Sequence, residues 1–152
     1  MKGLKNVKVY IKNVGVVTTN IGIENGKIAY IGDSAENIEP LFETDGVVLP
    51  GFIDEHIHGA GGADAMDGTV EALQTISEFV AREGTTGFLA TTMTQSPENI
   101  TSALKAVKKI REKGEYKGAE VLGVHLEGPF ISPKHVGAQP LEYVAKPSAK
   151  LF

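Results

Sequence analysis

The chain has 152 residues, of which 41% are hydrophobic and 22% are charged, and its formal net charge is −4. This is the composition of an ordinary globular protein. Its mild acidity provides no basic surface for nucleic acid, and no apolar run approaches the roughly 20 residues that cross a bilayer. There are no cysteines, so a bound metal would be held by histidine, carboxylate and water. The N-terminus lacks the apolar core of a signal peptide, and we expect a cytoplasmic protein without membrane or nucleic-acid partners.

The first 49 residues carry the signals of a small β unit. Apolar and polar residues alternate between Val7 and Ile11, a pattern typical of a half-exposed strand. Asn25-Gly26 separates two apolar segments, and this pair favours a tight hairpin because both residues tolerate positive φ. We predict an antiparallel unit that ends near Val47-Val48-Leu49 and that is too small to bury both of its faces alone.

From Pro50 onward the pattern changes to alternating strands and helices. Apolar runs predict strands at 51–58, 85–92 and 120–127. Capping residues and apolar periodicity predict helices from about 69 to 84 and from 96 to 114. This alternation with short connections is typical of parallel βαβ units, which occur in open doubly wound sheets and in (β/α)₈ barrels. Chemically active residues gather at the C-terminal ends of the first and third strands, and this favours the barrel.

Two histidines at the end of the first of these strands are the leading functional candidates. Alternate side chains of a strand share a face, so His56 and His58 project together. In a barrel, Glu127 at the end of the third strand would converge with them. Two imidazoles and a carboxylate suit a divalent cation, and zinc is the preferred candidate. Taken alone, a His-x-His pair is as compatible with an exposed strand edge that binds nothing. His125 is predicted to be a hydrogen-bonded or supporting residue, and His135 a solvated loop residue.

The ordered motifs resemble a known family. Residues 50–59, Pro-Gly-Phe-Ile-Asp-Glu-His-Ile-His-Gly, look like the first-strand signature of the amidohydrolase superfamily. His-Leu-Glu-Gly-Pro-Phe at 125–130 and Gly-Ala-Gln-Pro at 137–140 make the chain similar to the N-acetylglucosamine-6-phosphate deacetylases within it. The resemblance covers essentially the whole chain. It implies an α/β fold in which residues 50–152 form the first three βα units of a (β/α)₈ TIM-like barrel. Residues 1–49 would be the N-terminal part of a small β-sandwich domain.

The same resemblance implies a reaction and a set of site residues. The reaction is hydrolysis of the N-acetyl group of N-acetylglucosamine 6-phosphate to glucosamine 6-phosphate and acetate. It implies a divalent metal, zinc first and iron or another cation otherwise, and a homodimer. By motif match Glu127 is a metal ligand, and His56 and His58 match a pair that some members keep and others replace. Ala138 matches a position whose backbone contacts the sugar, and Gln139 stands where other members carry histidine, so both are expected to bind substrate.

Several parts of the family's site have no match in this sequence. The remaining metal histidines, the phosphate-binding residues and the acid/base aspartate are expected beyond residue 152, so no catalytic acid or base is assigned. We therefore expect an N-terminal portion that is inactive alone. Two other functions stay open. One is a different amidohydrolase such as a cyclic amidase, which the His-Leu-Glu-Gly-Pro strand end disfavours because those relatives generally use a carbamylated lysine. The other is a non-catalytic truncated fragment, which the chain length favours.

Overall fold

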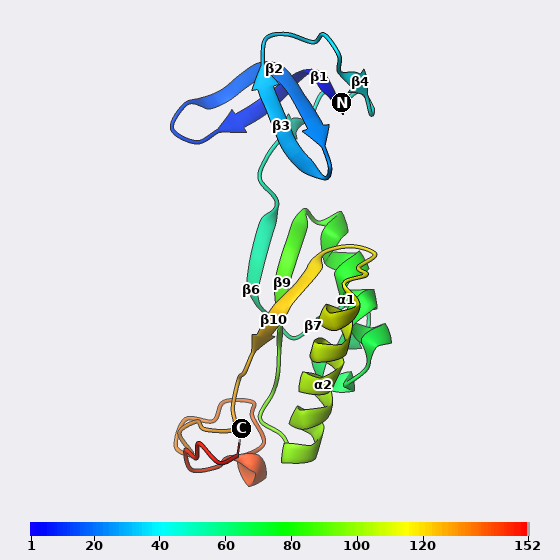
Figure 1. The fold of residues 1–152 in the computed structure, drawn as a ribbon. Helices are drawn as coiled ribbons and strands as arrows, with labels where there is room; N and C mark the ends of the chain where they lie inside the picture. The colour runs from blue at the N-terminus through cyan, green and yellow to red at the C-terminus, as the bar shows by residue number, and fades with distance from the viewer. Residues whose placement is uncertain (152) are drawn as a thin grey trace. The chain divides into compact units, whose positions relative to one another are not determined.

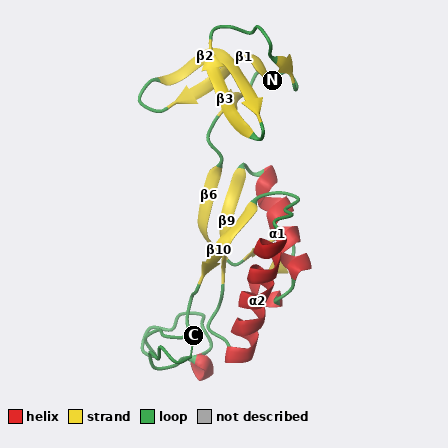
Figure 2. Ribbon diagram, in the orientation of Figure 1, coloured by secondary structure: helices red, strands yellow, loops and turns green. Residues whose placement is uncertain are grey.

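The computed structural model describes residues 1–151, and they divide into two compact units (Figure 1). The first unit is Met1–Pro50, and the second begins at Gly51. Among the described helices, none has both the length and the apolar character that a membrane span requires. Figure 2 shows that the first unit is built from strands alone, whereas the second combines strands and helices.

The first unit is a five-stranded sheet. Three long strands pair antiparallel in the order β3-β2-β1. They are β1 (Lys2–Ile11), β2 (Gly15–Glu24) and β3 (Lys27–Gly32). The predicted hairpin joins β2 to β3, with φ of 52° at Asn25 and 73° at Gly26. The small core of the first unit consists of Leu4, Val7, Val9 and Ile21.

The prediction of a wholly antiparallel unit is wrong for its last two strands. The short strands β4 (Glu39–Pro40) and β5 (Val47–Val48) both pair with β1 in parallel. The physical reason is the connection. The chain leaves β3 through an irregular segment and returns at the N-terminal end of β1, so it runs in the same direction as β1, whereas a tight hairpin would have reversed it.

The second unit is a parallel α/β structure, as its sequence pattern predicts. Its three strands are hydrogen-bonded in the order β10-β9-β6, and both pairings are parallel. The strands are β6 (Phe52–Ile57), β9 (Thr85–Thr91) and β10 (Glu120–His125). Helices α1 (Val70–Arg82) and α2 (Pro97–Lys113) connect them. The C-terminal ends of the parallel strands therefore meet at one edge of the sheet.

Local capping explains where both helices begin. The Thr69 side chain accepts a hydrogen bond from the Ala72 backbone N–H at 3.1 Å, and Ser96 does the same for Asn99 at 3.2 Å. These bonds satisfy backbone donors that the first turn of a helix leaves unpaired. The apolar faces of both helices then pack on the sheet around Phe88. This core also contains Leu73, Ile76, Val80, Val107, Ile110 and Val121.

Two further features of this unit surround the ends of the strands. The glycine-rich segment after β6 contains a small hairpin, β7 (Gly59–Ala60) and β8 (Ala63–Asp64), followed by the 3-10 turn Ala65–Asp67. After β10 the chain is irregular, apart from the 3-10 turn Leu141–Tyr143. The apolar start of β6 is exposed, with Phe52 at 60% and Ile53 at 56% of their full area, because β6 lies at the edge of the described sheet.

Candidate metal centre

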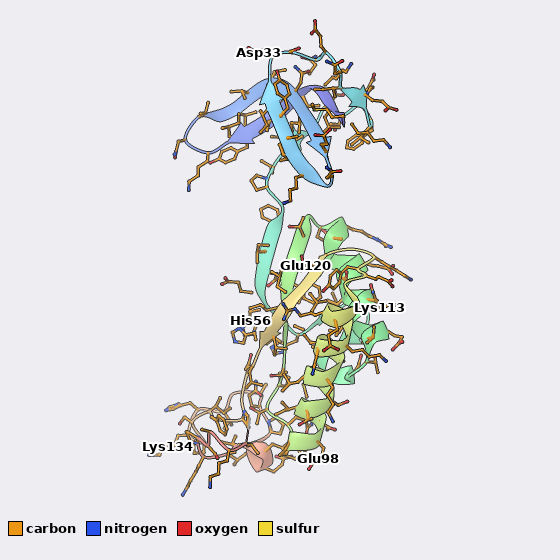
Figure 3. All side chains as sticks on the ribbon, viewed as in Figure 1. Asp33, His56, Glu98, Lys113, Glu120 and Lys134 are labelled. Carbon is orange, nitrogen blue, oxygen red and sulfur yellow. The ribbon has the colours of Figure 1, made fainter. Side chains whose placement is uncertain are left out.

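The C-terminal edge of the parallel sheet brings three potential metal ligands together. His56 lies in β6, and His58 follows its last residue (Figure 3 labels His56), while Glu127 follows β10 on the far side of β9. The Nε2 atoms of His56 and His58 lie 3.0 and 3.3 Å from the same carboxylate oxygen, Oε2 of Glu127. One donor atom from each residue lies within 4.8 Å of the other two. The structure thus brings together all three residues that the sequence analysis selected as ligands.

These separations suit a single small cation. Nitrogen and oxygen donors at about 2.0–2.2 Å from one tetrahedral cation lie roughly 3.3–3.6 Å from one another, close to the separations found here. The donor set of two imidazoles and one carboxylate is that of a borderline divalent metal. The ring nitrogen of His58 outside this donor set, Nδ1, is buried and has no hydrogen-bond partner among the described residues. Without a metal, the same contacts would be ion pairs only if the imidazoles were protonated. The three residues therefore fit a divalent metal, and their role as ligands stays a prediction.

His125 supports the site from within the sheet. Its Nδ1 lies 3.1 Å from the backbone carbonyl oxygen of Glu55, although β9 separates the two strands. Its ring packs against that of His56, with centroids 4.4 Å apart and planes tilted by 58°. It does not belong to the convergent ligand cluster. This agrees with its prediction as a hydrogen-bonded supporting residue.

Two side chains hold Glu127: Thr92, which was not identified from the sequence, and Gln139, which the sequence predicts as a substrate-binding residue. The hydroxyl of Thr92 accepts from the Glu127 backbone N–H at 3.1 Å and donates to the Glu127 carbonyl at 3.3 Å. The side-chain amide of Gln139 donates from Nε2 to Glu127 Oε1. Thr92 is 1% exposed and directly follows the largely buried strand β9. A threonine directly after a buried strand was the only available signal, and it is a weak one.

The other predicted site residues lie in the loop after β10. Ala138 is exposed there, and its neighbour Gln139 is partly buried because its side chain turns back to Glu127. His135 is exposed, and its backbone N–H donates to Ser132 in a turn, as predicted for a solvated loop residue.

Gly128 is required where the chain leaves Glu127. Its φ is +71°, and a Cβ added there would lie 2.0 Å from Oγ1 of Thr94. We expect Gly128→Ala to lower the free energy of unfolding by more than the about 1–2 kcal/mol that left-handed backbone costs an L-residue. It should also weaken metal binding, because Glu127 must shift. Chemical denaturation and zinc titration measure the two effects.

Gly114→Ala is the matched control for this substitution. Gly114 has φ +64°, but a Cβ there meets nothing within 4 Å, and the residue caps α2 away from the metal site. The Gly114→Ala variant should lose only the stability that corresponds to the cost of left-handed backbone, and its metal affinity should equal that of the wild type. Equal behaviour of the two variants in both assays would contradict the assigned role of Gly128.

The amino-acid sequence of the chain is similar to those of known proteins. The sequence profile of the amidohydrolase family matches residues 47–151. The chain is 44% identical over 156 residues to the N-acetylglucosamine-6-phosphate deacetylase of Bacillus subtilis, covering 93% of this chain and 39% of that protein. It is 40% identical over 110 residues to the N-acetylgalactosamine-6-phosphate deacetylase of Escherichia coli O157:H7, covering 69% of this chain and 29% of that protein.

Solved structures agree with the sequence comparison. The crystal structure of N-acetylglucosamine-6-phosphate deacetylase from Thermotoga maritima matches with a TM-score of 0.80 and 35% identity, covering 98% of this chain and 38% of that chain. The chain thus spans 39% of the length of the Bacillus relative and 38% of the Thermotoga structure.

Proposed function

The chain belongs to the amidohydrolase family, and from this premise we propose that it is part of a metal-dependent sugar-phosphate deacetylase. The reaction is hydrolysis of the N-acetyl group of N-acetylglucosamine 6-phosphate to glucosamine 6-phosphate and acetate. The observation that carries the proposal is the convergence of His56, His58 and Glu127 in a chain that is 44% identical to a deacetylase of this name.

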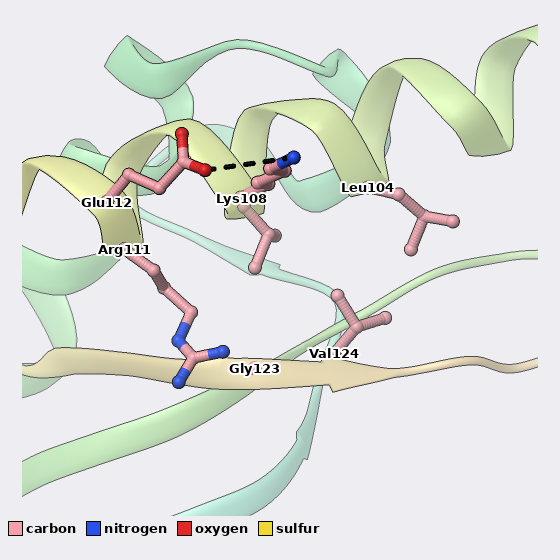
Figure 4. A pocket seen from close by; sticks show the side chains of 7 residues that line it. Leu104, Lys108, Arg111, Glu112, Gly123 and Val124 are labelled. Atoms are coloured by element: carbon pink, nitrogen blue, oxygen red, sulfur yellow. Dashed lines mark ion pairs between the residues drawn. The ribbon is translucent and has the colours of Figure 1, made fainter.

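We propose that residues 50–152 form the first three βα units of a (β/α)₈ barrel, and residues 1–49 part of a β-sandwich domain. Three parallel strands joined by helices support this, as does the edge of β10 to which no strand within residues 1–151 is paired. Beside that edge lies a groove of about 460 Å³ between α2 and β10 (Figure 4). Leu104 and Val124, which are partly buried, line it together with Val107, Lys108, Arg111, Glu112 and Gly123. A further βα unit would pair with β10 and cover Leu104 and Val124.

His56, His58 and Glu127 would hold the metal, with zinc first and iron or another divalent cation as alternatives. When bound, a divalent cation acts as a Lewis acid that polarises the amide carbonyl and makes water a stronger nucleophile. Two neutral imidazoles and one carboxylate bring a single negative charge, so a dication would keep a net positive charge at the site. Ala138, through its backbone, and Gln139 are proposed to contact the sugar. No acid or base is assigned within residues 1–152.

One alternative substrate has a specific observation in its favour. A relative that is 40% identical to the chain is named for N-acetylgalactosamine 6-phosphate, which differs in the configuration at one sugar carbon. A metal held by the proposed ligands would act on the acetamido group, which both sugars share. The two substrates must therefore be separated by experiment.

We also propose a cytoplasmic location and a homodimer. A sugar phosphate carries charge that cannot cross a bilayer unaided, so an enzyme that uses it works where the phosphate ester is made. The dimer is supported by the family resemblance.

The proposed reaction gives a direct test. The protein expressed from its complete gene should release acetate from N-acetylglucosamine 6-phosphate and should do so faster than from its galacto epimer. Chelation followed by dialysis should remove the activity, and one equivalent of zinc should restore it, because the ligand set would hold the Lewis acid that polarises the amide carbonyl. Acetate release and metal content are measured on the same samples. Full activity in metal-free samples would contradict a metal-dependent mechanism, and release from neither epimer would contradict the assigned substrates.

A further inference from the structure

The side chain of Gln139 links three segments at the candidate metal centre. Gln139 lies in the loop after β10, and its amide returns to the carboxylate of Glu127, twelve residues earlier. Its Oε1 accepts a hydrogen bond from the backbone N–H of Thr94 at 2.7 Å. Its Nε2, besides donating to Glu127 Oε1, lies 3.6 Å from Sδ of Met93. One amide thus connects the loop, the segment after β9 and the Glu127 carboxylate.

The orientation of this amide follows from the chemistry of its partners. The Thr94 N–H can only donate, so it must face the amide oxygen of Gln139. The NH₂ group then has to face Glu127, whose ionised carboxylate can only accept. The reversed orientation would place a donor against a donor and an oxygen against an oxygen. The Thr94 backbone therefore determines which end of Gln139 meets Glu127.

This arrangement gives the two oxygens of Glu127 different partners. Oε1 receives the Gln139 amide, and Oε2 faces the Nε2 atoms of His56 and His58 at 3.0 and 3.3 Å. Rotation of the carboxylate would break the bond to Gln139. Thr92 already holds the Glu127 backbone on both sides, so the remaining freedom of the residue lies in its side chain.

We propose that Gln139 is a positioning residue that directs Oε2 of Glu127 toward a divalent metal. The inference deepens the proposed function and rests on it for the identity of the metal ligands. This role differs from the substrate contact proposed above, because contact with the substrate alone would not require a hydrogen bond from Gln139 to Glu127. Groups that hydrogen-bond to metal ligands typically change metal affinity about 10- to 100-fold when removed.

The test measures zinc affinity by competition with a chromogenic chelator, on the protein expressed from its complete gene. Gln139→Leu, which removes the side-chain hydrogen bonds to Thr94 and Glu127, should weaken zinc binding by about 10- to 100-fold. Gln139→Glu should weaken it at least as much, because it places a second carboxylate against Glu127. The absorption spectrum of the cobalt-substituted protein should change in both variants, since it reports the ligand geometry.

Gln74→Glu is the matched control. Gln74 is also partly buried, and its amide also joins one acceptor and one donor, the backbone carbonyl of Glu115 and the backbone N–H of Lys117. It lies on α1, away from the ligands. It should leave zinc affinity and the cobalt spectrum unchanged. Gln139→His tests rescue, because an imidazole N–H can still donate to Glu127. It should bind zinc more tightly than Gln139→Leu, even if both variants lose stability.

The outcomes separate this inference from the function on which it rests. Unchanged zinc affinity and an unchanged cobalt spectrum in Gln139→Leu would overturn the positioning role, even if the enzyme deacetylates its substrate. Weakened binding in the Gln139 variants but no acetate release by the wild type would overturn the proposed function and leave the positioning role standing. Equal losses in Gln139→His and Gln139→Leu would show that the N–H bond to Glu127 is not what matters.

Discussion

Replacing Glu127 with glutamine is expected to reduce the zinc affinity of the protein by more than about 100-fold and to abolish metal-dependent activity. Glu127 is the only anionic group in the described ligand cluster, and its Oε2 lies within 3.3 Å of both imidazoles. Glutamine has nearly the same shape but no charge. Mutation of a residue that only supports a metal ligand lowers metal affinity by up to about 100-fold, so removal of a ligand itself should lower it further. Elemental analysis after dialysis and zinc titration measure the effect.

Glu120→Gln is the matched control for this prediction. Glu120 is exposed at the start of β10, the strand that Glu127 follows, and Figure 3 labels it there. The substitution makes the same change of charge without touching the ligand cluster, so metal content should match the wild type. Normal metal content in Glu127→Gln would refute the assignment of Glu127 as a ligand. A comparable loss in both variants would point to a general effect of charge.

Phe88→Ala is expected to produce the largest loss of stability among single core substitutions. Phe88 is 0% exposed in the central strand β9, and residues of both helices and of β10 share its core. Truncation of a buried phenylalanine costs about 3–5 kcal/mol through lost apolar burial and the remaining cavity. This is a large share of the about 5–15 kcal/mol that stabilises a typical folded protein. Chemical denaturation of both proteins gives the difference in free energy of unfolding.

Phe79→Ala makes the same chemical change at a more exposed position. Phe79 lies on α1 and is 46% exposed, so its truncation removes less buried area and leaves no closed cavity. We expect a loss of about 1 kcal/mol, in line with roughly 25 cal/mol per Å² of apolar surface. If Phe79→Ala were as destabilising as Phe88→Ala, Phe88 would not be the centre of this core.

The sequence alone was sufficient for features that depend on near neighbours. Asn25-Gly26 predicts its hairpin because both residues accept positive φ, and the structure has both there. Thr69 and Ser96 mark the starts of α1 and α2 because a side-chain oxygen close in sequence satisfies unpaired backbone N–H groups. The family resemblance inferred from the motifs is confirmed by the profile match and by the relatives.

The arrangement around the candidate metal centre depends on contacts between distant parts of the chain. Strand periodicity places His56 and His58 on one face, but only the strand order β10-β9-β6 and the path of the sheet bring Glu127 to them. The hydrogen bond of His125 to the carbonyl of Glu55 joins residues 70 positions apart. Local propensity carries no information about such partners, because they are selected by packing and by the paths of the connecting segments.

The sequence by itself therefore determined the types and starts of the main elements, the family and the three candidate ligands. Only the tertiary structure determined the parallel pairing of β4 and β5 with β1, the hydrogen bond between Thr92 and Glu127, and the orientation of the Gln139 amide. The first group follows from dihedral preferences and periodicity over a few residues. The second depends on which donors and acceptors meet once the chain is folded, and a buried polar group takes whichever complementary partner the fold places beside it.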